Sequence, residues 1–207
     1  GDVRYYFANP GYGYTRPMAE GGLLSDSYPA MPRAKRDYLA FSLALEKRFA
    51  GNWFGGFSYT LSRLAGNYPG LASSDENGRN SPNLERSFDY WFLLYTKDHQ
   101  LIDGPLPTDR THYLKAYGAY VFPWRLTVGT VVQAMSGVPI TEIWNVWDAD
   151  MRPYNRGNLG RTPFLWFVNL YAEYRWKIGR SSLTFSLNVD NLFDTKTATQ
   201  RYPYRTM

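Results

Sequence analysis

Apolar and polar side chains alternate along six stretches of this chain, each about ten residues long. In the clearest stretch, residues 182–190, the even positions hold Ser, Thr, Asn and Asp, and the odd positions hold Leu183, Phe185, Leu187 and Val189. Side chains on a strand point alternately to its two faces, so this pattern predicts a strand between an apolar and a polar environment. The other five predicted strands are residues 38–49, 53–64, 111–122, 126–135 and 164–177.

The connections between these strands are alternately very short and very long. Residues 50–52, 123–124 and 178–180 allow only tight turns, whereas residues 65–109 and 136–163 form long loops rich in Gly, Pro, Asn and Asp. An antiparallel chain returns to the same side at every second turn, so the short turns share one end of the sheet. This asymmetry is typical of an all-β, antiparallel transmembrane β-barrel with short periplasmic turns and long extracellular loops.

The charged residues agree with this interpretation. Mid-strand charges all fall on the polar side of the alternation, at Glu46, Lys115, Glu173, Arg175 and Asp190. An Arg or Lys that faces lipid at the bilayer centre costs about 2–4 kcal/mol, so even one on the apolar side would weaken the assignment. Lys47 and Arg63 share the apolar side but lie at strand ends, where they can reach the interface.

Composition adds information about the environment. Phe, Trp and Tyr make up 18% of the 207 residues, and five of them flank the short turns, as in an interfacial girdle: Phe49, Trp53, Phe122, Trp124 and Trp176. No run reaches the roughly 18 apolar residues of a membrane helix. The net charge of +5 comes from scattered basic residues, so we expect no nucleic-acid partner. The absence of cysteine excludes disulfides and thiolate metal sites.

The first 35 residues carry a weaker pattern. Residues 3–7 and 12–14 offer one further strand, which makes six or seven strands in all, but prolines interrupt the alternation at Pro10, Pro17, Pro29 and Pro32. The chain starts at Gly1 without an initiator Met or a signal peptide. We therefore expect it to begin inside a longer protein.

Several short motifs resemble those of one known family. Asn191-Leu192-Phe193-Asp194, followed by Lys196, resembles a motif near the end of TonB-dependent outer-membrane receptors. The Oar-like branch of these receptors, which carries a carboxypeptidase regulatory-like domain, is similar at further motifs: Lys47-Arg48-Phe49 with Trp53, Ser58-Tyr59-Thr60, Gly66-Asn67-Tyr68 and Gly104-Pro105-Leu106-Pro107-Thr108-Asp109-Arg110. The resemblance covers residues 36–197.

The resemblance implies a barrel of about 22 strands around a plug. Residues 1–207 would then be a partial barrel domain without the plug and the final strands. The implied function is energised uptake of a scarce solute across the outer membrane of a Gram-negative-type bacterium. The implied partners are outer-membrane lipid, the plug and remaining strands of the same protein, and a TonB-type energising protein that acts through the N-terminal part.

No catalytic group emerges from the sequence, and we expect neither an enzyme nor a cofactor or metal site. His99 and His112 lack partners at metal-ligand spacing, and no calcium-loop pattern is completed by Asp75, Glu76 and Asn77 or by Asp148 and Asp150. Aromatic residues in the loop segments 88–95 and 144–147 are the best candidates for solute contact: Tyr90, Trp91, Trp144 and Trp147. The alternative is that these rings pack against each other and close the loops.

Three functions compete at this stage. The first is the wall of a TonB-dependent transporter, which supplies scaffold and loops and no chemistry of its own. The second is a soluble β-sandwich that binds carbohydrate through exposed aromatic rings, although the apolar faces of all six strands lack mid-strand charge. The third is a structural or adhesion barrel, which differs from the first only in the part that precedes this chain.

Overall fold

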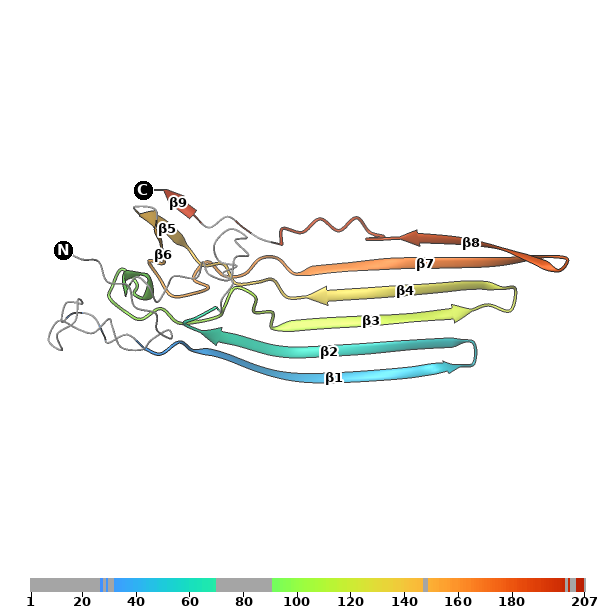
Figure 1. Ribbon diagram of the computed structural model, residues 1–207, viewed down its shortest axis with the longest axis horizontal. Coiled ribbons are helices and arrows are strands. Elements are labelled where there is room, and N and C mark those ends of the chain that lie inside the picture. The colour runs from blue at the N-terminus through green and yellow to red at the C-terminus, as the bar shows by residue number, and fades with distance from the viewer. Residues whose placement is uncertain are drawn as a thin grey trace, which may run out of the picture.

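The computed structural model describes residues 32–69, 91–146, 149–199 and 204–206, and the single residues 27, 29 and 201. Six long antiparallel strands form one open sheet in the order β1-β2-β3-β4-β7-β8 (Figure 1). Their bounds are β1 (Arg36–Ala50), β2 (Trp53–Gly66), β3 (His112–Val121), β4 (Leu126–Met135), β7 (Leu165–Ile178) and β8 (Ser181–Val189). Each predicted strand is thus confirmed to within two residues at either end.

The tight turns lie together at one end of the sheet, and the long connections lie at the other (Figure 1). We call these the turn end and the loop end. At the first turn Gly51 and Asn52 both have positive φ, 62° and 68°. This conformation suits two-residue hairpin loops, because their backbone twist then matches that of the flanking strands. The predicted up-and-down order is therefore confirmed.

The register of the strands joins the six apolar sets into one continuous face. Leu43 on β1 pairs with Tyr59 on β2, and this alignment continues across the sheet. One row that crosses five strands contains Gly55, Gly118, Thr130, Leu170 and Val189. Since side chains alternate along each strand, such a register keeps every apolar set on the same side. We call this side the apolar face and the opposite side the polar face.

The apolar face is uncovered across the whole sheet, with its side chains most exposed on the outer strands β1 and β8 and half-buried by their neighbours on much of β2, β3, β4 and β7. Leu39 is 78% exposed, Phe41 65% and Leu187 57%. Over the strands that the structure describes, no second layer covers these side chains. The face carries charge in these strands only near their ends, at Asp37, Lys47 and Arg63. The predicted mid-strand charges lie on the polar face instead: Glu46, Lys115, Glu173 and Arg175.

Hydrogen bonds between neighbouring strands characterise the polar face. The hydroxyl oxygens of Ser42 and Thr60 lie 3.0 Å apart, and the Tyr113 hydroxyl donates to Gln133 Oε1 at 3.2 Å. The Tyr171 hydroxyl donates to Glu173 Oε2 at 2.5 Å along the same strand. The two faces thus differ in chemistry as the sequence predicts.

The loop end holds the elements that alternation did not reveal. In the predicted loop 136–163, β5 (Ile143–Val146) pairs antiparallel with β6 (Ala149–Met151), and β9 (Tyr204–Thr206) adds to β5 in parallel. A short 3-10 helix, η2 (Trp91–Leu94), lies in the other long loop. No helix in the described ranges is long and apolar enough to cross a membrane. The further strand predicted in residues 3–14 lies outside the described residues.

Candidate functional site: the loop cap

Residues 91–110 and 136–163 fold back onto the loop end of the sheet, and we call this packed unit the loop cap. The described side chains with the lowest exposure gather here and at the adjoining strand ends, among them Leu64, Leu94, Tyr95, Ile102, Leu106, Ile140 and Ile143. Leu106 and Ile143 have no exposed surface at all. Among the described residues, the hydrophobic core therefore lies at the loop end, in the two long loops and at the adjoining ends of β2 and β4.

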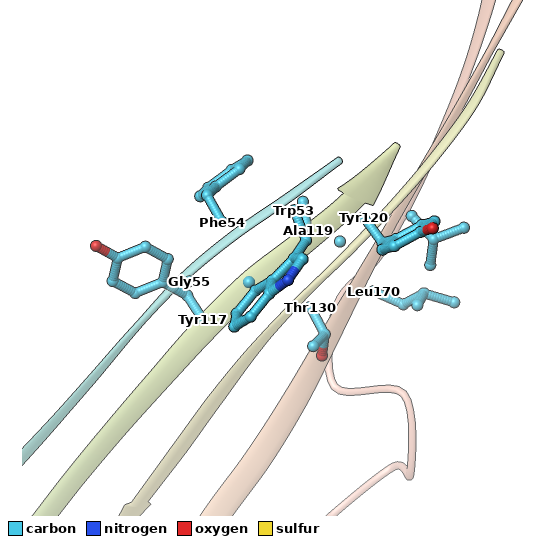
Figure 2. A pocket seen from close by; sticks show the side chains of 11 residues that line it. Trp53, Phe54, Gly55, Tyr117, Ala119, Tyr120, Thr130 and Leu170 are labelled. Atoms are coloured by element: carbon cyan, nitrogen blue, oxygen red, sulfur yellow. The ribbon is translucent and has the colours of Figure 1, made fainter. Parts of the chain in front are cut away.

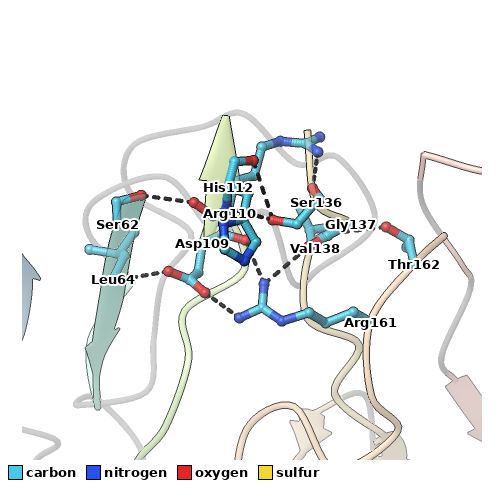
Figure 3. A network of polar contacts seen from close by, with 10 residues as sticks. All are labelled: Ser62, Leu64, Asp109, Arg110, His112, Ser136, Gly137, Val138, Arg161 and Thr162. Atoms are coloured by element: carbon cyan, nitrogen blue, oxygen red, sulfur yellow. Dashed lines mark hydrogen bonds and ion pairs between the residues drawn. The ribbon is translucent and has the colours of Figure 1, made fainter. Parts of the chain in front are cut away.

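Asp109 links three segments at the base of the loop cap (Figure 3). It is 2% exposed, and its Oδ1 accepts a hydrogen bond of 2.6 Å from the backbone N–H of Leu64 on β2. Its Oδ2 forms an ion pair with the guanidinium group of Arg161. Arg161 also donates to the carbonyl oxygens of Asp109 and Gly137, at 3.1 and 3.0 Å. We call these four residues the Asp109 clamp; it fixes both long loops to the strand ends.

Residues 104–110 carry one of the motifs that resemble the Oar-like branch, and they extend the pairing at the end of β2. The Gly66 N–H donates to the Gly104 carbonyl at 2.9 Å, and the Leu106 N–H donates to the Leu64 carbonyl at 3.0 Å. Gly104 has φ +134°, and a Cβ there would lie 3.0 Å from the carbonyl oxygen of Arg156. The motif is therefore a structural strap, which needs glycine where the second loop crosses it.

A second set of contacts joins the start of β3 to the end of β4 (Figure 3). The Ser62 hydroxyl donates to the Arg110 carbonyl, and the Arg110 guanidinium donates to the Ser136 carbonyl, both at 2.7 Å. The Ser136 hydroxyl accepts from the His112 N–H at 3.0 Å. The loop cap is thus tied to three neighbouring strands through polar groups of Ser62, Arg110, His112 and Ser136.

The predicted solute contacts can be placed only in part. Tyr90 and Trp147 lie outside the described residues, and of Trp91 the structure places only the backbone, in η2. The Trp144 side chain is half-buried; its indole N–H donates to Glu142 Oε1 at 2.9 Å, and its ring packs edge-on against Tyr154 at 6.4 Å. These contacts favour the alternative in which loop aromatics pack together, and solute contact stays a prediction.

The family motif at residues 191–194 terminates β8. Asn191 has φ +51°; its Oδ1 accepts from the Thr195 N–H at 3.0 Å, and its Nδ2 donates to the Thr195 carbonyl at 3.2 Å. The Leu192 N–H donates to the Val168 carbonyl of β7 at 2.7 Å, so the turn stays attached to the sheet. Phe193 is 61% exposed, and Asp194 forms an ion pair of 2.8 Å with Lys196. The motif thus ends a strand with a turn that stays hydrogen-bonded to the sheet.

The histidines and loop acids considered for metal binding can be placed only in part. In the described ranges no group of three or more His, Cys, Asp or Glu side chains could hold a metal ion. His112 Nδ1 lies 2.7 Å from the Tyr59 hydroxyl, and His99 occupies a turn with φ +60°. Asp75, Glu76, Asn77 and Asp148 lie outside the described residues, and only the backbone of Asp150 is placed, in β6.

Sequence reasoning missed the charged residues buried in the loop cap. Arg152 is 1% exposed, Arg156 4% and Glu142 5%. The Glu142 backbone N–H donates a hydrogen bond of 2.9 Å to Asn158 Oδ1. Charged residues among Gly, Pro and Asn are typical of solvated loops, so no local signal in the sequence distinguishes these from exposed ones.

Comparison with curated proteins identifies a relative of this chain. The chain is 31% identical over 212 residues to the TonB-dependent transporter Oar of Myxococcus xanthus, and the match covers 97% of this chain. The chain spans 18% of the length of that protein. No protein-family profile matches the chain, and no solved structure does. Together with the six-stranded antiparallel sheet, this similarity shows that the chain belongs to the TonB-dependent transporter family.

Proposed function

We propose that this chain forms part of the barrel wall of an outer-membrane transporter that takes up a scarce solute with energy from a TonB-type partner. The observation that carries the proposal is the apolar face, which is continuous over six strands, exposed, and free of mid-strand charge. A patch of this extent is rare on soluble monomers. It is the surface that a strand layer needs when lipid replaces water.

The proposal includes further strands at both edges of the sheet. β1 and β8 each have one neighbouring strand in the six-stranded sheet. In a bilayer each unpaired backbone group costs several kcal/mol, about what an unsatisfied buried amide costs, so sheets that span membranes close into barrels. The remaining strands, and a plug on the polar face, would come from other parts of the transporter. In this arrangement the turn end faces the periplasm and the loop cap faces the outside.

In this function the chain acts as scaffold and not as an enzyme. The Asp109 clamp and the strap at residues 104–110 hold the long loops at the outer end of the wall. Such a fixed platform is what a solute site on loops requires. Contact of the solute with Tyr90, Trp91, Trp144 and Trp147 is the part of the proposal that rests on the sequence alone.

The two competing functions differ in what they require. A soluble carbohydrate-binding sandwich needs a second sheet over the apolar face, and the described residues place their three-stranded sheet at the loop end instead. A structural or adhesion barrel would share the same wall. It differs in having no energised uptake, so transport measurements separate it from the first proposal.

The test has two stages. The first is fractionation of cells that express the receptor containing this chain, with detergent required for its extraction from the outer membrane. A product that is soluble and monomeric without detergent would support the sandwich. The second compares depletion of solutes from the medium by cells with and without the receptor, in the presence and absence of a protonophore. Uptake should need the proton gradient, and residues 1–207 alone should support none.

A further inference from the structure

An open groove of about 700 Å³ lies on the sheet near the turn end (Figure 2). Its floor is the backbone of Gly55 and Gly118, which pair across β2 and β3. Trp53 and Tyr120 border it toward the turns, and Thr130 and Leu170 continue it across β4 and β7. All six side-chain positions belong to the apolar face. The volume falls within the range of about 300–1,000 Å³ that is usual for small-molecule sites.

The groove is a fixed feature of the wall. It lies on β2, β3, β4 and β7, which already have strands on both sides, so further strands at the edges of the sheet would not fill it. Its floor also resists filling by substitution. A Cβ at Gly55 would lie 3.0 Å from the Tyr117 carbonyl oxygen, and one at Gly118 would lie 3.1 Å from the Phe54 carbonyl oxygen.

A cation lies at the rim of the groove. Lys47 pairs with Gly55 in the strand register, and its Nζ lies 4.0 Å from the centre of the Trp53 ring. The ammonium group donates to the carbonyl oxygens of Ala50 and Trp53 at 2.7 and 3.3 Å. These acceptors are neutral, and no carboxylate of the described chain lies within ion-pair distance of Lys47. Its positive charge therefore stays available to an anion at this level.

The whole turn end is basic. In the half of the sheet nearest the three short turns, and in the turns themselves, the described residues include two carboxylates, Glu46 and Glu173, and six cations: Lys47, Arg48, Arg125, Arg175, Lys177 and Arg180. Of these cations, only Arg175 forms an ion pair with a described carboxylate, that of Glu173 at 3.5 Å. Lys47 on the apolar face, and Arg125 and Arg180 in the turns, therefore give this end a charge that is complementary to a layer of anionic headgroups.

We propose that the groove binds one anionic phospholipid of the leaflet that the turn end faces, with an acyl chain along Gly55 and Gly118 and the phosphate near Lys47. This rests on the proposed membrane function. Between lipid and protein within a bilayer the hydrophobic effect gives no preference, so packing decides. The atoms that line an empty groove lack dispersion contacts on one side. A flexible acyl chain can enter the space that neighbouring side chains leave open and supply these contacts.

Lipid titration of the purified full-length receptor, read by native mass spectrometry, tests the groove. Phosphatidylglycerol and phosphatidylcholine are the two probes. Thr130→Trp places an indole ring in the groove, and aromatic residues are well tolerated in strands. This substitution should weaken the tightest phosphatidylglycerol binding at least tenfold. The matched control is Leu187→Trp, which adds a ring to the same face on β8, outside the groove, and should bind as the wild type does. Equal binding by Thr130→Trp and the wild type, or an equal loss in both variants, overturns the proposal.

Variants of Lys47 test the assignment of the lipid headgroup. Lys47→Gln should abolish the preference for phosphatidylglycerol over phosphatidylcholine, and Lys47→Arg should keep it. An unchanged preference in Lys47→Gln overturns the headgroup assignment. Failure here is distinguishable from failure of the proposed function: a receptor that is soluble without detergent refutes the membrane function itself. A receptor that needs detergent but binds lipid equally in every variant refutes only the groove.

Discussion

The wall and the loop cap place the same kinds of side chain in opposite environments. In the six-stranded wall, large apolar side chains such as Leu39 and Phe41 are exposed, at 78% and 65%. In the loop cap, Leu106 has no exposed surface, and the charged Asp109 is almost as deeply buried, at 2%. In a water-soluble protein we would expect the opposite, with apolar side chains buried and charged side chains exposed. Under the proposed function the wall meets lipid in place of water, whereas the loop cap provides its own interior.

The two regions are therefore held together by different forces. The wall consists of backbone ladders, and its side chains contribute mainly by matching the medium on each face. The loop cap follows the rules of a small soluble domain, with buried apolar groups and a charged pair satisfied by several hydrogen bonds. Substitutions should consequently have different effects in the two regions, and each effect should depend on the face or partner that is altered.

The largest expected effect separates the two faces of the wall. Val131 and Val132 are adjacent on β4 and point to the polar and the apolar face. Val132→Arg should destabilise the receptor in lipid vesicles by about 2–4 kcal/mol, because the charge faces the hydrocarbon. Val131→Arg is the matched control and should cost far less. Denaturant unfolding monitored by tryptophan fluorescence measures both, and equal losses would show that β4 does not separate lipid from an aqueous interior.

The next effect tests the Asp109 clamp. Asp109→Ala leaves the Leu64 N–H and the Arg161 guanidinium without their acceptor. We expect a local loss of about 2–3 kcal/mol, below the range for fully buried pairs because Arg161 is 34% exposed. Hydrogen exchange should increase at residues 104–110 and 137–162, while the wall stays protected. The exposed Asp98 serves as control; if Asp98→Ala has the same effect, the clamp does not hold the loop cap.

The wall could be predicted from the sequence because its signal is local. At residues 126–135 the predicted strand and β4 coincide. Apolar residues at every second position indicate a strand face that contacts the same medium along its whole length, and this pattern can be read from neighbouring residues alone. The register follows from the same signal, because a shift of one residue would move each apolar set to the wrong face.

The loop cap could not be predicted in this way. Asp109 finds its partners 45 residues earlier, at Leu64, and 52 residues later, at Arg161. Contacts between residues so far apart in the sequence leave no periodic pattern. The short strands β5 and β6 lie in a segment where the alternation of apolar and polar residues is too short to detect. Trp144 illustrates the consequence for the site. Its residue type suggested solute contact, and only the fold places it against Tyr154 and Glu142.

A smaller effect is expected where the wall ends at the family motif. Asn191→Ala removes two side-chain hydrogen bonds to Thr195 and places alanine at positive φ, so we expect a loss of about 1–2 kcal/mol. Asn191→Gly removes the same bonds but tolerates the backbone conformation, and it should lose less. Unfolding in vesicles measures both, with the exposed Asn188→Ala as control. If alanine and glycine cost the same, the conformation of this turn contributes nothing to stability.

The smallest expected effect concerns a pair on the polar face, where Tyr117 on β3 lies directly opposite Gly56 on β2. A Cβ at Gly56 would lie 2.5 Å from the Tyr117 ring, so the ring covers the glycine and takes the place of its missing side chain. Gly56→Ala should therefore destabilise the wild type, because the ring must move. In the Tyr117→Ala background the same substitution should stabilise the wall by about 0.5–1 kcal/mol, since glycine is the poorer strand residue. A double-mutant cycle in vesicles measures this change of sign. If Gly56→Ala changed the stability in the same direction in both backgrounds, cover by the Tyr117 ring would not explain the glycine at position 56. Side chains on the wall would then contribute to stability only by matching the medium that surrounds them.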